Sequence, residues 1–196
     1  MKLQIIVGST RPGRATNLLA KWVALEAANL EATEVEVVDL ADYDLPFFNE
    51  AVSPRYNPNR QPDAEVQKWL DKIAEGDAYV YVTPEYNHSI PGVLKNAIDF
   101  LTNEMAQKPA TVVAHGSVGG ARATMHLKEI LSESQAVIVP AAVAFGYSVA
   151  TGGVFDENGN LLDESVKANP YGPQAALKKA LTDLTWFGNA LKVARG

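Results

Sequence analysis

The stretch Leu3–Arg14 (LQIIVGSTRPGR) decides the fold, because an apolar run of strand character ends abruptly in a turn of glycine, hydroxyl and arginine residues. A helical pattern then begins near Thr16, with Leu19 and Val23 on one face. A strand that leads into a helix N-terminus through such a turn brings backbone N–H groups and the positive end of the helix dipole together. The sequence therefore predicts that Gly8–Arg14 holds a phosphate.

Strand and helix patterns alternate along the rest of the chain. Further strands are predicted over residues 35–40, 78–83, 110–114 and 136–139, and further helices around 66–73, 94–101 and 127–131 and from about 173. Near-continuous apolar strands separated by helices are typical of a parallel sheet that is covered on both faces. No repeat, charge block or linker divides the chain, so residues 1–196 are predicted to form a single α/β domain.

Composition excludes several classes of protein. The net charge of −6 argues against a general surface for nucleic acid or anionic membranes. The absence of cysteine excludes disulfide scaffolds, thiolate nucleophiles and cysteine-ligated metal sites. The N-terminus enters the first strand without a signal-peptide pattern, and no apolar run approaches the roughly 20 residues of a membrane helix. We therefore expect a cytoplasmic protein without membrane insertion.

Two segments interrupt the alternation. Residues 41–62 contain four prolines and the adjacent aromatics Phe47 and Phe48, both expected to be exposed. A long loop of this kind in a compact domain is either a binding arm or a mobile connection. The second segment, from about Tyr147 to Tyr171, is expected to be a surface excursion with Asn158-Gly159 at the tip of a turn.

Three unusual loops follow strands that are expected to end at the same edge of the sheet. They are Gly8–Arg14, Thr83–Gly92 and His115–Arg122. The prolines of the second loop stiffen it, while Tyr86 offers a flat face to a planar ligand. Glycines of the third loop let the backbone approach a ligand closely. Because ligands of open parallel sheets bind outside the carboxyl ends of the strands, the three loops predict one cleft.

These motifs carry a family resemblance. The chain resembles the NAD(P)H-dependent FMN reductases, flavodoxin-like proteins that include quinone, azo-dye and chromate reductases. The family pattern P-E-Y-N-x-S-x-P-G-x-L-K-N-A-I-D stands nearly whole from Pro84 to Asp99, and the later G-S-x-G-G-x-R pattern stands from Gly116 to Arg122. The resemblance covers roughly the first 150 residues. It implies a three-layer sandwich with a five-stranded parallel sheet of order 2-1-3-4-5.

The resemblance also implies a set of FMN-binding residues. The phosphate would be held by Ser9, Arg11, Thr16 and Asn17; the ring and ribityl chain would be bordered by Pro84, Glu85, Tyr86 and Asn87; and the pyrimidine side would be lined by Gly116, Ser117, Gly119 and Gly120. Two positions depart from the family, since Arg14 replaces a common serine and Thr16 a common asparagine. Arg14 either holds the phosphate by a bidentate contact or points to solvent.

The activity implied by the resemblance is hydride transfer from NAD(P)H through bound FMN to quinones, or to free flavin, azo compounds or chromate. No dedicated catalytic acid, base or nucleophile is expected, because the cofactor carries the chemistry. No metal site is expected either, since His88, His115 and His126 lack the spacing of ligand motifs. The alternative function is an electron carrier or an FMN-binding regulatory protein without turnover. A homodimer or homotetramer is expected, with the 41–62 segment at the interface.

Overall fold

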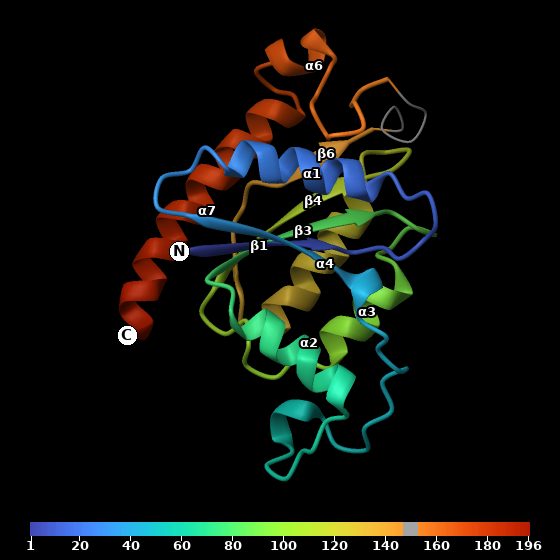
Figure 1. Cartoon of the computed structure of the whole chain (residues 1–196), viewed down its shortest axis with the longest axis vertical. Coiled ribbons are helices and arrows are strands. Elements are labelled where there is room, and N and C mark those ends of the chain that lie inside the picture. The colour runs from blue at the N-terminus through green and yellow to red at the C-terminus, as the bar shows by residue number, and fades with distance from the viewer. Residues whose placement is uncertain (147–152) are drawn as a thin grey trace.

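A parallel β-sheet forms the centre of this computed structural model, which describes residues 1–146 and 153–196 (Figure 1). Its strands within that part are β1 (Lys2–Val7), β2 (Glu34–Asp39), β3 (Ala78–Pro84), β4 (Pro109–His115), β5 (Val137–Ile138) and β6 (Val143–Phe145). The order β2-β1-β3-β4-β5 confirms the expected topology, and β6 also pairs with β4. Every pairing is parallel, so the carboxyl ends of the strands share one edge.

The fifth position of the sheet is split, which corrects the prediction of one continuous strand over 136–139. The N–H of Val139 still donates to the carbonyl of Ala110 at 2.9 Å, but Pro140 has no N–H to continue the ladder. Thr111 Oγ1 instead donates to the carbonyl of Ala141, and pairing resumes with β6. The interruption brings Phe145 beside the third loop, where its carbonyl accepts a hydrogen bond from the N–H of Gly116 at 3.1 Å.

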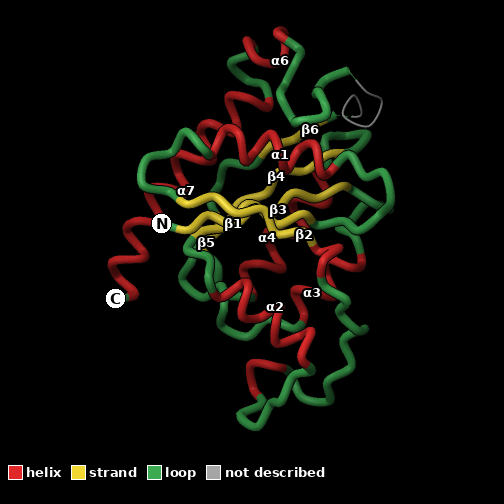
Figure 2. Tube along the Cα trace, viewed as in Figure 1, coloured by secondary structure: helices red, strands yellow, loops and turns green. Residues whose placement is uncertain are grey.

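Helices cover both faces of the sheet (Figure 2). On one face lie α1 (Thr16–Ala27) and α7 (Pro173–Arg195), and on the other lie α2 (Ala64–Ala74), α3 (Gly92–Asp99) and α4 (Ala121–Glu133). Alternate residues of a strand point to opposite faces. Accordingly, Ile5 packs with α1 and α7, while Ile6 packs with α2 and α3. Burial on both faces explains why the strands are apolar almost throughout.

The segment 41–62 runs beside α3, and Asn96 of that helix holds its Pro46–Phe48 part. Asn96 Oδ1 accepts from the N–H of Phe48, and Asn96 Nδ2 donates to the carbonyl of Pro46, both at 2.8 Å. Phe48 then packs edge-on against Phe100, with ring centroids 5.3 Å apart. Only Phe47 is exposed, at 89%, so the expectation that both aromatics are exposed was wrong for Phe48.

The described part of the second interrupting segment is a turn followed by a short helix. Phe155 pairs with Leu161 across a tight turn, and Gly159 at its tip has a φ of +88°, as expected from the Asn-Gly pair. The short helix α6 (Glu164–Ala168) leads to α7. Residues 147–152, which belong to the same predicted surface excursion, lie outside the described part of the chain. Among the described residues, no helix is long and apolar enough to cross a bilayer.

Candidate functional site

The three loops singled out from the sequence meet at the carboxyl edge of the sheet and enclose a cleft of ≈ 480 Å³. Its walls are formed by Arg11–Ala15, Pro84–Tyr86, His115–Ser117 and Gly146. Each wall follows a different strand, which explains why segments about 100 residues apart in sequence face one another.

The first wall depends on a close approach at Gly8. Its N–H donates to the carbonyl of Val82 at 2.8 Å, and a Cβ at this position would lie 2.8 Å from Leu94 Cδ2. A Cβ would also lie 3.0 Å from the carbonyl oxygen of Val82, so the absence of a side chain lets the turn leave β1 and pass close over β3. Beyond it, Arg11, Pro12 and Gly13 are exposed at the mouth of the cleft.

The N-termini of α1 and α4 both point at this edge of the sheet. They differ in whether an acidic group compensates the positive end of the helix dipole. At the start of α1, Ala15 provides no side-chain cap, and the first turn contains no acidic residue. At the start of α4, Glu85 Oε2 accepts hydrogen bonds from the N–H groups of Arg122 and Ala123, at 3.0 and 3.5 Å. The carboxylate of Glu85 thus neutralises the positive end of α4, while that of α1 remains able to attract an anion.

Glu85 also forms an ion pair that joins the second loop to the third. Its Oε1 lies 2.7 Å from Arg122 Nε and 2.5 Å from Arg122 Nη2. Desolvation acts to raise the pKa of the buried Glu85 carboxyl, but the hydrogen bonds from Arg122 and the α4 amides outweigh it and hold this pKa below its usual range. Glu85 is therefore ionised at neutral pH and ties two walls of the cleft together.

Arg14 does not point to solvent. Its guanidinium forms an ion pair with Asp39 at the end of β2, and its Nε donates to Asn17 Oδ1 at 2.9 Å. Arg14 also lines the cleft. A positive charge is thus held at the mouth of the first loop by partners on β2 and α1.

Thr16 and His115 form a buried contact beneath the cleft. Thr16 Oγ1 lies 3.0 Å from His115 Nε2, and both residues are buried. Burial lowers the pKa of His115 to about 4, so its imidazole is neutral at pH 7. This contact fixes the first turn of α1 to the end of β4, the two elements that supply the first and third walls.

The second loop is a hairpin whose base is tied to the first loop. Tyr86 and Ser89 exchange backbone hydrogen bonds at 2.9 and 3.0 Å, and the intervening Asn87 and His88 have φ values of 49° and 68°. Such positive φ values at both central residues define a type I′ turn, which asparagine and histidine tolerate better than most residues. The hydroxyls of Tyr86 and Ser9 lie 3.0 Å apart, which holds the hairpin against the first loop.

Glycines allow the third loop to pack against the sheet. Gly119 and Gly120 both have a φ of +72°, and a Cβ on Gly120 would lie 2.6 Å from Ala114 Cβ. A Cβ on Gly119 would lie 3.0 Å from Ala144 Cβ. These glycines form the turn that starts α4, whereas Gly116 and the exposed Ser117 face the cleft.

The residues predicted from the sequence therefore divide into two groups. Those that line the cleft are Arg11, Arg14, Pro84, Glu85, Tyr86, Gly116 and Ser117. Those that lie behind or beside its walls are Ser9, Thr16, Asn17, Asn87, Gly119 and Gly120. The set of FMN-binding residues left out His115, Asp39 and Gly146. His115 does open the third predicted loop, and the sequence signal for Asp39 was its position at the carboxyl end of β2. Gly146 had no signal beyond its place after a predicted strand.

Comparisons with known proteins agree with this geometry. A family model described as NADPH-dependent FMN reductase matches residues 1–150. An NAD(P)H-dependent FMN reductase of a Nectria species is 32% identical over 191 residues, which is 93% of this chain and 94% of the relative. A quinone reductase of Escherichia coli is 31% identical over 173 residues, or 83% of this chain and 87% of the relative. The solved structure of the flavoenzyme NAD(P)H:(acceptor) oxidoreductase FerB from Paracoccus denitrificans is 27% identical, covers 96% of this chain and 97% of its own, and superposes with a TM-score of 0.70.

Proposed function

Since the chain belongs to the NADPH-dependent FMN reductase family, we propose that its sheet-edge cleft holds FMN and that it reduces quinones or similar small acceptors with NAD(P)H. The alternative of an electron carrier has no support among the similar proteins, which are named reductases and oxidoreductases. The observation that carries the proposal is the uncapped N-terminus of α1 inside the cleft, beside an α4 N-terminus that Glu85 neutralises.

The phosphate end of FMN fits the first wall. The start of α1 offers backbone N–H groups with no acidic residue to compete, and Arg11 and Arg14 add positive charge at the same point. Asp39 offsets part of the charge of Arg14, so Arg11 supplies the larger share of unpaired positive charge. We assign Ser9, Thr16 and Asn17 to positioning this loop, since their side chains bond to Tyr86, His115 and Arg14.

The ring end of FMN fits between the second and third walls. Pro84, Glu85 and Tyr86 form one side, and Gly116 and Ser117 form the other. A Cβ on Gly116 would lie 3.1 Å from Glu85 Cβ, so glycine keeps the slot between the two loops open. The Glu85–Arg122 pair holds both loops at a constant separation.

The chemistry that FMN supplies when bound is hydride transfer from a reduced nicotinamide to an electron acceptor. The chain's own residues bind and orient the cofactor and leave the cleft open to small molecules. No side chain is assigned as a dedicated acid, base or nucleophile.

The absorbance spectrum of the purified protein with added FMN, followed by steady-state assays, tests the proposal. We expect saturable FMN binding and oxidation of NADH or NADPH that depends on a quinone such as benzoquinone. FMN binding without turnover with quinone, azo-dye, chromate or free flavin acceptors would favour the electron-carrier alternative. Absence of FMN binding would overturn both.

We also propose that residues 1–196 form one domain and that two copies associate beside the cleft. Phe47 and Val93 are exposed and line an apolar cavity of ≈ 140 Å³ together with Thr10 of the phosphate loop. Exposed aromatics next to a binding cleft are typical of interfaces. A second copy seated on this surface would cover Phe47 and border the FMN site, giving a homodimer or a tetramer of two such dimers.

A further inference from the structure

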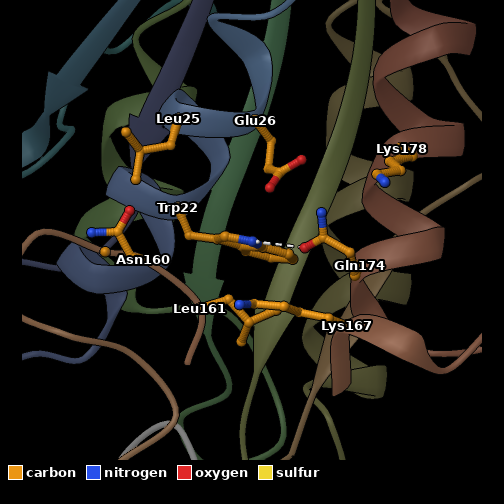
Figure 3. A pocket seen from close by; sticks show the side chains of 9 residues that line it. Trp22, Leu25, Glu26, Asn160, Leu161, Lys167, Gln174 and Lys178 are labelled. Carbon is orange, nitrogen blue, oxygen red and sulfur yellow. Dashed lines mark hydrogen bonds between the residues drawn. The ribbon is translucent and has the colours of Figure 1, made fainter. Parts of the chain in front are cut away.

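A second cavity, of ≈ 340 Å³, lies between α1, the 159–161 turn, α6 and α7 (Figure 3). It shares no lining residue with the cleft at the carboxyl edge of the sheet. Its volume is near the lower end of the range for small-molecule sites, which suits a ligand of single-residue size and excludes a whole dinucleotide.

The floor of this cavity is apolar and firmly supported. The Trp22 ring is buried and packs edge-on against Phe145, with ring centroids 5.4 Å apart. It also packs against the tilted ring of Phe155, with centroids 5.7 Å apart. Leu25 and Leu161 extend the apolar surface on either side. Gly159 lets its turn lie close against α1, because a Cβ at this position would lie only 2.9 Å from the backbone nitrogen of Trp22. The floor therefore keeps its shape without a ligand.

A buried amide points into the cavity from α7. Gln174 is only 8% exposed, and its Oε1 accepts a hydrogen bond of 3.0 Å from Trp22 Nε1. An indole N–H is only a donor, so this contact fixes the amide with its oxygen toward Trp22 and its nitrogen away from it. Figure 3 shows that nitrogen directed into the space between Glu26 and Lys178. In residues 1–146 and 153–196, no group accepts a hydrogen bond from Gln174 Nε2.

Opposite charges face the cavity from opposite walls. Glu26 projects from α1 and Lys178 from α7 (Figure 3), and neither forms an ion pair with any described residue. Lys167 also lines the cavity, but its ammonium group pairs with Glu164 at 2.7 Å. Asn160 lines the cavity as well, and its Nδ2 donates to Asp156. Besides these residues, the cavity presents the Glu26 carboxylate as an acceptor and Gln174 Nε2 and Lys178 Nζ as donors around the apolar floor.

We propose that this cavity binds a free α-amino acid with an apolar side chain. The ligand carboxylate accepts hydrogen bonds from Gln174 Nε2 and Lys178 Nζ, and its ammonium group pairs with Glu26. The side chain covers the floor formed by Trp22, Leu25 and Leu161. This three-part arrangement gives a partner to Glu26, to Lys178 and to the Gln174 Nε2 donor, none of which pairs with another side chain of the described residues.

Isothermal titration of the FMN-loaded protein with leucine and phenylalanine tests the proposal. We expect saturable binding of at least one of them, and binding at least about tenfold weaker for its N-acetyl and amide derivatives, since each loses one charged contact. Glu26→Gln and Lys178→Ala should each weaken binding by a similar factor. Lys179→Ala is the matched control, because Lys179 is the next residue of α7 and pairs with Asp183 on the surface.

Quinone reduction should be unchanged in all three variants, because the two cavities have no lining residue in common. The proposal is overturned if neither amino acid binds, or if Glu26→Gln and Lys178→Ala bind as tightly as the unaltered protein. Equal affinity for the N-acetyl derivative also contradicts it, because the ligand would then need no ammonium group. None of these results bears on the assignment of FMN to the other cleft.

Discussion

Glu85 and Arg122 join the second and third loops through a two-point contact, in which one carboxylate oxygen lies 2.7 Å from Arg122 Nε and the other lies 3.0 Å from the Arg122 backbone nitrogen. The same carboxylate therefore pairs with a side chain and caps a helix. With the positive end of α4 already neutralised, the start of α1 is where an anion gains most from a helix dipole. This relationship supports the proposed orientation of FMN, with its phosphate at the first loop.

Replacing Glu85 with Gln should lower the free energy of unfolding by about 2 kcal/mol, the usual range for lost hydrogen bonds to a charged group. FMN should also bind more weakly, because the two loops lose their tie. The difference in stability should shrink in acid, as the pKa of Glu85 lies below its usual range and the protonated carboxyl resembles the amide. Urea unfolding at several pH values measures this, with the exposed Glu129→Gln on α4 as control. An unchanged unfolding midpoint at pH 7 would contradict it.

Arg11→Ala should weaken FMN binding by roughly 10- to 100-fold and leave riboflavin binding almost unchanged, because the lost contact is to the phosphate. Titration of the apoprotein against flavin fluorescence gives both affinities. Lys21→Ala removes a positive charge from the exposed face of α1, outside the cleft, and should affect neither. Equal losses for FMN and riboflavin would instead place Arg11 against the ring.

Arg14→Ala should reduce stability as well as FMN affinity, because it leaves the half-buried Asp39 without its partner. We expect a loss of about 2 kcal/mol, less than for a fully buried pair. The double variant Arg14→Ala with Asp39→Asn should recover part of this stability but not the FMN affinity. Thermal unfolding and flavin titration of the single and double variants separate the two effects. A single variant of unaltered stability would show that the ion pair does not contribute.

Stability should fall as the pH is lowered from 7 toward 4, with His115 as one cause. Burial lowers the pKa of His115 from 6.5 to about 4 in the folded protein. Below pH 6.5 the unfolded chain therefore takes up a proton that the folded protein does not, which favours unfolding by about 2 kcal/mol at pH 5. His115→Gln keeps a donor and acceptor near Thr16 and should flatten this part of the pH profile. His126→Gln, on the exposed side of α4, is the matched control for the loss of an imidazole.

Phe47→Asp should convert the proposed dimer to monomer, because a carboxylate at the centre of an apolar interface must be desolvated without a partner. Light scattering at micromolar concentration measures the mass directly. Tyr171→Asp provides the control, since Tyr171 is equally exposed but lies near the start of α7, away from the cleft. A monomeric unaltered protein would refute the proposed assembly.

Local patterns in the sequence were enough to predict the class of fold and the location of the site. Strand runs such as Ile5–Val7 and helical spacings such as Leu177–Leu184 report burial directly, because each pattern matches the period of its backbone. The carboxyl ends of parallel strands share one edge, so the three loops had to meet there. Motifs that resemble those of a known family predicted the sheet order, which the structure confirms, and assigned FMN to the three loops.

Only the tertiary structure decided which side chains face the cleft and which hold its walls. Thr16 and His115 are 99 residues apart, Glu85 and Arg122 are 37 apart, and Arg14 and Asp39 are 25 apart. No local periodicity encodes such pairs, because each depends on how strands separated by whole helices lie side by side. Three further features arise in the same way: the split of the last sheet position at Pro140, the partial burial of Phe48 beside the exposed Phe47, and the direction of the Gln174 amide into a second cavity. The sequence by itself determined the strand–helix order and the chemistry available at each loop, whereas the tertiary packing determined the partner of each polar group.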